Sequence, residues 1–351
     1  MEVEPGKREL SAMNKPNKWL RCQWCGAEGL PECLELDEAN GDGFWCPDCD
    51  GHTYYDEERN KLRRILLILE NKDAPAPVVV SDMKLKKRMS PLRYPGGKSK
   101  LIDYLSGKFR NEQMQTFVET FAGGASVGLA LLDAGLTKHL VLNDTDPGVY
   151  AFWAQVVSDP SELLKRLSGR TPGRADYQTA KGVLDEPKYW NQSEIAWSQL
   201  LVNRLSFSGI SKACAMGGKN GREEQFLSRW NPAELKRRIE RIHAMADHIE
   251  VTCLNAEALI ETSAYWDGQA TLFVDPPYVK EGKRLYRRYF DEEDHRQLAW
   301  LIEALYQGMP GADIIITYDD CELIRSIYHY ADTVTIGRNY SICKQRTQKE
   351  D

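Results

Sequence analysis

Thr271-Leu-Phe-Val-Asp-Pro-Pro-Tyr278 is a run of four residues with strand character that leads directly into an acid, two prolines and a tyrosine. Proline has a fixed φ and no backbone N–H, so the strand must end at this turn. The turn holds Asp275 and Tyr278 at the carboxyl end of a buried strand, the edge at which open α/β sheets bind ligands. An acid beside an aromatic ring suits a flat heterocycle with an amino group. Taken alone, however, so short a match is more typical of a solvated Asp-Pro turn.

A glycine-rich turn upstream has the form of a nucleoside-binding unit. In Thr116-Phe-Val-Glu-Thr-Phe-Ala-Gly-Gly-Ala-Ser-Val-Gly128, a short strand precedes the glycines and a helix to Asp133 follows them. Such a turn brings backbone N–H groups to a ligand at a helix N-terminus. A second predicted strand, His139 to Leu142, ends in Asn143-Asp144-Thr145-Asp146. An acid at that place binds a ribose hydroxyl in nucleotide-type sheets. Asp144 could instead be a capping residue, but capping does not account for Asp146 as well.

Four segments in this order resemble Dam-type (D12 class) DNA adenine-N6 methyltransferases: Tyr94-Pro-Gly-Gly-Lys98, Glu119-Thr-Phe-Ala-Gly-Gly-Ala-Ser126, Asn143-Asp144 and Asp275-Pro-Pro-Tyr278. The resemblance covers about residues 90–346. It implies an α/β fold, with a Rossmann-like S-adenosylmethionine-dependent methyltransferase sheet and an inserted helical DNA-recognition region. It also implies that S-adenosylmethionine lies among Tyr94, Lys98, Gly123 and Asp144, and that the Asp-Pro-Pro-Tyr turn contacts both cofactor and target base.

This chain departs from the family pattern at two points. Tyr94 stands where a tryptophan is common, and the glycine turn reads Ala-Gly-Gly-Ala where Gly-x-Gly is frequent, so Ala125 can narrow the backbone approach. The Gly-Gly-Lys-Ser sequence at 96–99 is not a P-loop, because the first glycine of that motif is missing and no strand is predicted before it.

The expected reaction is methyl transfer from S-adenosylmethionine to N6 of adenine in double-stranded DNA at a specific site. The adenine amine is a poor nucleophile, and Asp275 with the Pro276 carbonyl can accept its two hydrogens. Catalysis is then mostly positioning and electrostatics. The base must leave the duplex, and Tyr278 would stack on it. The alternatives are N4-cytosine methylation, an RNA or protein-amide methyltransferase on the same fold, and a catalytically inactive DNA-binding protein. A restriction enzyme as the partner of this protein is compatible with the predicted site-specific DNA methylation.

Two basic regions are candidates for DNA contacts. About residues 159–248 separate the two halves of the sheet and form the predicted target-recognition insert, in which a polar, glycine-rich loop suits phosphates and base edges. A second basic stretch, interleaved with tyrosines, follows the Asp-Pro-Pro-Tyr turn. The predicted contact residues are Arg204, Lys219, Arg222, Lys283, Arg284, Arg287 and Arg288.

The N-terminal segment carries a pattern typical of structural zinc. Cys22, Cys25, Cys46 and Cys49 form two Cys-x-x-Cys knuckles at zinc-ribbon spacing, with Cys33 and His52 as possible substitutes. A segment this short buries no core, so a metal would supply its folding energy. A redox pair is the alternative, but no βαβ pattern surrounds either knuckle. Zinc ribbons serve nucleic acids and protein partners alike.

Length and spacing predict three parts: a zinc-ribbon-like module at 1–56, a helix and linker at 57–88, and a methyltransferase domain at 89–351. The predicted helix, at 55–70, rests on the spacing of Leu62, Ile65, Leu66 and Leu69. The 351 residues contain no apolar run of membrane-spanning length and no signal-peptide pattern, which predicts a cytoplasmic protein without a membrane partner. The formal net charge of −6 argues against indiscriminate coating of nucleic acid.

Overall fold

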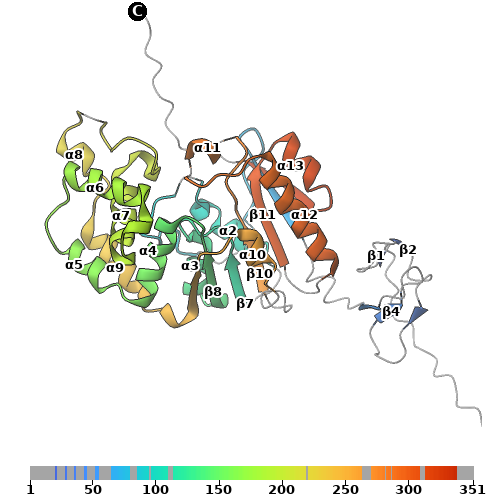
Figure 1. Ribbon diagram of the computed structural model, residues 1–351. Coiled ribbons are helices and arrows are strands. Elements are labelled where there is room, and N and C mark those ends of the chain that lie inside the picture. Colours follow the sequence, from blue (N-terminus) through green and yellow to red (C-terminus); the bar gives the residue numbers. More distant parts are fainter. Residues whose placement is uncertain are drawn as a thin grey trace, which may run out of the picture.

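The structure, a computed structural model, describes residues 65–79, 85–94, 96–109, 114–218, 220–262, 270–280, 282–285, 287–308 and 313–337 (Figure 1). It also describes five short strands nearer the N-terminus. These strands are β1 (Leu20–Arg21), β2 (Glu28–Gly29), β3 (Glu35–Leu36), β4 (Gly43–Trp45) and β5 (His52–Tyr54). β1 pairs with β2, and β4 pairs with β3 and β5, all antiparallel. The four cysteines predicted to bind zinc lie outside the described residues.

A seven-stranded sheet is the centre of the described structure. Its order is β12-β6-β11-β10-β7-β8-β9, and every neighbouring pair is parallel. The strands are β6 (Ile65–Asn71), β7 (Met114–Glu119), β8 (Thr137–Asn143), β9 (Ile249–Thr252), β10 (Ala270–Val274), β11 (Asp313–Asp319) and β12 (Asp332–Gly337). The predicted Rossmann-like α/β class is therefore confirmed.

Strand β6 corrects the predicted helix at 55–70. Residues 65–70 are a buried strand between β11 and β12, and residues 55–64 lie outside the described residues. A continuous apolar run such as Ile65-Leu-Leu-Ile-Leu69 is typical of a parallel strand buried on both faces, and helical spacing occurs in it by chance. We therefore propose that the catalytic unit begins at Ile65 and not at residue 89.

The order of the strands places a ligand site between β7 and β10. The chain runs from β7 outward through β8 to β9, then returns to β10 on the other side of β7 and continues to β11. In open parallel sheets a ligand binds at the carboxyl ends of the strands where the order reverses. The glycine turn after β7 and the Asp-Pro-Pro-Tyr turn after β10 meet at this place.

Helices cover both faces of the sheet. One face packs on α10 (Ala256–Ile260), α12 (Glu292–Gly308) and α13 (Glu322–Ile327) through an apolar cluster that includes Leu67, Val274 and Ile316. The opposite face packs on η2 (Lys98–Lys100), α2 (Ile102–Ser106), α3 (Ser126–Asp133) and α4 (Pro147–Ser158). The short helix α11 (Gly282–Leu285) follows the Asp-Pro-Pro-Tyr turn. No helix in the described parts of the chain is both long and apolar enough to cross a bilayer.

The predicted insert is helical and gathers beside the β8 end of the sheet (Figure 1). Its elements are α5 (Ser161–Leu167), α6 (Arg174–Asp185), η3 (Pro187–Tyr189), α7 (Gln192–Leu205), η4 (Phe207–Gly209), α8 (Glu223–Phe226), α9 (Pro232–His243) and η5 (Ala246–His248). Its core is continuous with that of α3 and α4. The insert is therefore packed onto the catalytic sheet over a shared apolar surface.

Candidate active site

A cavity of about 750 Å³, counted to its open mouth, lies at the carboxyl ends of β7, β8 and β10. The predicted residues that line it are Tyr94, Lys98, Gly123, Asp144, Asp275, Arg287 and Arg288. The four segments quoted from the sequence therefore contribute to one cavity.

Side-chain alternation explains why polar groups converge on one edge of the sheet. On four neighbouring strands the last apolar residue of one face is followed, two positions later, by a polar residue on the same face. These pairs are Ile68 and Glu70, Ile315 and Thr317, Phe273 and Asp275, and Phe117 and Glu119. One face of the sheet is thus apolar along these strands. At the carboxyl edge it ends in the carboxyl groups of Glu70, Asp275 and Glu119 and the hydroxyl of Thr317.

Asp275 is held by two donors that reach the same oxygen. Lys98 Nζ pairs with Asp275 Oδ1, and Thr317 Oγ1 donates to that oxygen at 2.6 Å. No donor from the described residues reaches Oδ2. Lys98 is itself 3% exposed and also donates to the Gly96 carbonyl at 3.1 Å. The carboxylate is therefore oriented before any substrate enters, with one oxygen left for a further donor.

The Asp-Pro-Pro-Tyr turn is anchored by the neighbouring strand. Asp319, at the end of β11, accepts from the backbone N–H groups of Val279 and Lys280 at 3.2 and 3.3 Å. Pro276 is buried. The ring of Tyr278 lies 6.0 Å from that of Tyr318 and 5.0 Å from Lys98 Nζ, and Tyr278 is not one of the cavity-lining residues. Its predicted stacking on a base therefore stays a prediction.

The glycine turn is fixed from three sides. Gly123 has a φ of +45°, and a Cβ there would lie 2.8 Å from the ring of Tyr94. Its N–H donates to Asp144 Oδ2 at 2.8 Å, and its carbonyl accepts from Trp153 Nε1 at 2.9 Å. Only glycine combines this φ with so close an aromatic ring. Ala125 also has a positive φ, +48°, and forms part of the cavity wall immediately before α3.

Two buried carboxyl groups in the cavity wall have raised pKa values. Burial raises the pKa of Glu119 to about 8, although its Oε1 accepts from the Gly128 N–H at 2.5 Å. Burial, together with the charge of Asp146, raises the pKa of Asp144 to about 7. Asp146 itself caps α4 by accepting from the N–H groups of Gly148 and Val149 at 2.8 and 3.3 Å. A cation bound in the cavity would stabilise the charged form of both carboxyls.

The sequence model of the D12 class N6 adenine-specific DNA methyltransferases matches residues 94–342. The chain belongs to this family. Comparison with the curated proteins finds no match. The predicted activity, methylation of adenine N6 in DNA with S-adenosylmethionine as methyl donor, is thereby confirmed at the level of the family, and N4-cytosine methylation is not favoured.

The cavity of this methyltransferase fits a cofactor that carries a nucleoside and a positive sulfonium centre. Four carboxyl groups line it, from Glu119, Asp144, Asp146 and Asp275, against three cationic side chains. The missing Cβ of Gly123 lets the ring of Tyr94 pack against the glycine turn, where this ring forms part of the cavity wall and can contact a flat ligand. Both features suit S-adenosylmethionine.

The basic stretch after the Asp-Pro-Pro-Tyr turn lies partly at the cavity. Arg287 lines it and also donates to the Leu184 carbonyl and to Asp185 Oδ1 at 2.7 and 2.9 Å, so this arginine ties the turn to α6 of the insert. Arg288 lines the cavity and is exposed, and Lys283 is exposed on α11. The side chain of Arg284 is outside the described part of the structure.

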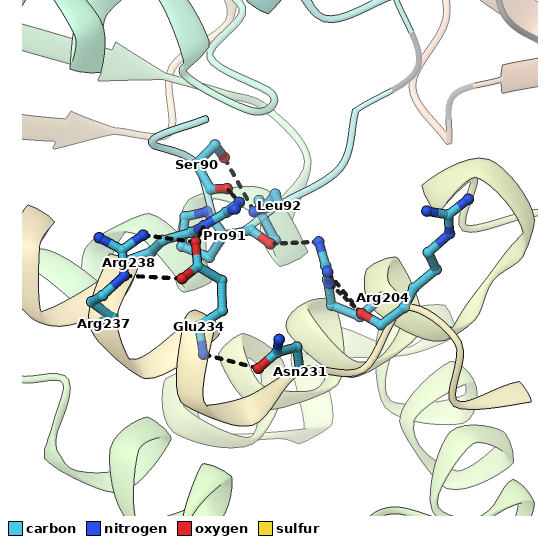
Figure 2. Close-up of polar contacts among 9 residues, drawn as sticks. Ser90, Pro91, Leu92, Arg204, Asn231, Glu234, Arg237 and Arg238 are labelled. Atoms are coloured by element: carbon cyan, nitrogen blue, oxygen red, sulfur yellow. Dashed lines mark hydrogen bonds and ion pairs between the residues drawn. The ribbon is translucent and has the colours of Figure 1, made fainter. Parts of the chain in front are cut away.

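Of the DNA-contact residues predicted in the insert, Arg204 and Arg222 do not line the cavity. Arg204 donates to the Arg229 carbonyl at 2.7 and 3.1 Å and to the Pro91 carbonyl at 3.5 Å (Figure 2). Arg238 donates to the Ser90 carbonyl at 2.8 Å in the same place. These contacts favour a role for Arg204 in packing the segment before Tyr94. Arg222 is exposed at the start of α8, and Lys219 lies outside the described residues.

Sequence reasoning missed Glu70, Glu119, Thr317 and Asp319 as site residues. Glu119 was inside a quoted motif, and its place at the end of a strand before a glycine turn was a usable signal. Thr317 and Asp319 follow the apolar run Ile314-Ile-Ile316, which is a usable signal for the end of a buried strand. Glu70 had no such signal, because its strand was predicted as a helix. The described residues contain no group of three or more His, Cys, Asp or Glu side chains that could hold a metal.

Proposed function

We propose that this methyltransferase flips an adenine out of double-stranded DNA and holds its amine against Asp275. The observation that carries this proposal is the orientation of the Asp275 carboxylate, whose Oδ1 is occupied by Lys98 and Thr317. The other oxygen and the Pro276 carbonyl are then the two acceptors for the amine hydrogens.

Bound S-adenosylmethionine supplies a methyl group activated by its positive sulfur. The residues of the chain do the positioning. Asp275 Oδ2 accepts one N–H of the amine, directs its lone pair and can take the proton that the amine loses. The backbone of Gly123 and the carboxyl of Asp144 hold the nucleoside part, with Tyr94 over the turn. Preorganised contacts of this kind are the main source of rate in such a site.

Substitution of Asp275 tests the proposal. Asp275→Ala should reduce methyl transfer by on the order of a hundredfold to a thousandfold, because a preorganised electrostatic contact at the reacting atom is lost. Asp275→Asn should also be poor, since its amide puts a donor where an acceptor is needed. The measurement is transfer of tritiated methyl groups to adenine-containing duplexes, with the product identified as N6-methyladenine or N4-methylcytosine.

Tyr278 supplies the matched comparison within the same turn. Tyr278→Ala should lose base stacking of about 1–3 kcal/mol, whereas Tyr278→Phe and Tyr278→Trp should keep much of the activity. An Asp275→Ala protein that methylates DNA at the wild-type rate would show that the catalytic assignment is wrong.

The finer features of the substrate and of the N-terminus are also proposals. Exposed Arg288 at the cavity and exposed Lys283 on α11 support binding of the phosphates that flank a flipped base. The spacing of Cys22, Cys25, Cys46 and Cys49 supports one structural zinc in the N-terminal module.

A further inference from the structure

Glu70 brings a second carboxylate to the ammonium group that orients Asp275. Its side chain is fully buried, and its Oε1 lies 3.6 Å from Lys98 Nζ. In the sheet Glu70 is the register partner of Asp319, so it stands at the carboxyl end of β6, level with the anchor of the Asp-Pro-Pro-Tyr turn. The family model begins at residue 94, so Glu70 comes from outside the matched segment.

The ammonium group of Lys98 interacts with more than one carboxylate. Two carboxylates, from Glu70 and Asp275, face one ammonium group in a region where Lys98 is almost completely buried. An ammonium has three N–H donors, and the Gly96 carbonyl accepts one of them at 3.1 Å. If Lys98 interacted with Asp275 alone, its whole charge would act on that carboxylate and weaken it as an acceptor. Because Glu70 also interacts with the ammonium, the positive potential that Lys98 exerts on Asp275 is smaller. Glu70 also holds the ammonium in place.

We propose that Glu70 is a positioning residue for methyl transfer, and that it acts through Lys98 to set the orientation and acceptor strength of Asp275. The inference rests on the proposed catalytic role of Asp275. It assigns to strand β6 a part in the reaction that is exerted through Lys98, in addition to its part in the sheet. Glu70 touches neither the adenine nor the cofactor in this scheme.

The test is a double-mutant cycle on the full chain, with single-turnover methyl transfer to an adenine-containing duplex as the readout. Glu70→Gln should lower the transfer rate roughly tenfold, while the Kd values for S-adenosylmethionine and DNA change less than about twofold. In a Lys98→Met background, the further change Glu70→Gln should have little effect on the rate, because the group through which Glu70 acts is gone.

Asp313→Asn is the matched control. Asp313 is a buried carboxylate at the opposite, amino end of β11, 2% exposed and away from the cavity. This variant should transfer methyl groups at the wild-type rate even if its stability changes. Glu70→Asp keeps the charge but withdraws it by one methylene, and its rate should lie between those of wild type and Glu70→Gln.

Three outcomes overturn the proposal. A wild-type rate for Glu70→Gln or, where that protein does not fold, for Glu70→Asp shows that the carboxylate has no such role. Independent, multiplying effects of Glu70→Gln and Lys98→Met show that Glu70 does not act through the ammonium. An Asp275→Ala protein with wild-type activity removes the proposed function and this inference together. Loss of activity in Asp275→Ala with no effect of Glu70→Gln removes the inference alone.

Discussion

At the scale of the residue, Glu119 links the stability of the protein to pH. Its pKa in the folded protein is about 8, against an ordinary value of 4.5, because the side chain is buried. The folded state therefore binds the proton more tightly than the unfolded state, and the free energy of unfolding falls as pH rises between these two values. Below pH 4.5 both states are protonated and this dependence disappears.

We expect the cofactor-free protein to lose stability from pH 5 to pH 8, by up to about 1.4 kcal/mol per pH unit from this one group. Glu119→Gln keeps an oxygen for the Gly128 N–H and cannot ionise, so its stability should depend less on pH. Urea unfolding at several pH values measures both proteins. Parallel curves for the two would mean that Glu119 does not titrate in this range.

The arginines and lysines predicted to contact DNA divide into exposed and packed residues. Lys283 and Arg288 are exposed, whereas burial and then the charges of Arg93, Arg238 and Arg229 lower the pKa of Arg204 to about 10.

Neutralising Lys283 and Arg288 together should flatten the salt dependence of DNA affinity by about two phosphate contacts. Arg204→Ala should leave that slope unchanged and lower the melting temperature. Fluorescence anisotropy over a salt series measures how DNA affinity depends on salt. A weaker salt dependence in Arg204→Ala would show that Arg204 contacts DNA.

At the scale of the element, strand β6 decides where the catalytic unit begins. It separates β11 from β12, and its residues Leu67, Ile68 and Leu69 have no exposed surface. A chain that begins at residue 57 keeps the strand, and a chain that begins at residue 89 lacks it. We expect the first to unfold cooperatively and bind S-adenosylmethionine, and the second to aggregate because two strand edges are uncovered.

Circular dichroism and calorimetric titration compare these two truncations. The chain that begins at residue 57 also lacks the N-terminal module, so it serves as the control for loss of that module. Cofactor binding by the chain that begins at residue 89 would show that β6 is dispensable.

At the scale of the whole molecule, the insert and the cofactor segment are held together near Tyr94. Asn203 of α7 accepts from the Arg93 N–H at 2.7 Å and donates to the Arg93 carbonyl at 2.8 Å. Arg238 of α9 donates to the carbonyl of Ser90 (Figure 2). The insert that is predicted to recognise DNA is thus hydrogen-bonded directly to the segment that precedes the glycine turn and carries Tyr94.

The predicted zinc module can be tested by metal analysis. Purified protein should contain about one zinc per chain. Cys46→Ser should lose the metal and leave S-adenosylmethionine binding nearly intact, because the sequence predicts that the module is a separate unit. Metal analysis together with thiol titration measures this, and a native protein without zinc and with four reactive thiols would contradict it.

The sequence alone determined the parts of the site whose chemistry is local. A proline pair ends a strand wherever it occurs, and a glycine turn between a strand and a helix presents N–H groups whatever lies around it. Asp275, Gly123, Asp144 and Lys98 are therefore predicted from local patterns, and all four line one cavity in the structure.

Only the tertiary structure decided what depends on partners far along the chain. Residues 65–70 become a strand because β11 and β12, about 250 residues later, supply both of its neighbours, and an apolar run carries no periodicity that distinguishes this outcome from a helix. The role of Glu70 follows from that pairing. The packing of Arg204 is likewise set by carbonyls of Pro91 and Arg229, which no local pattern connects to it.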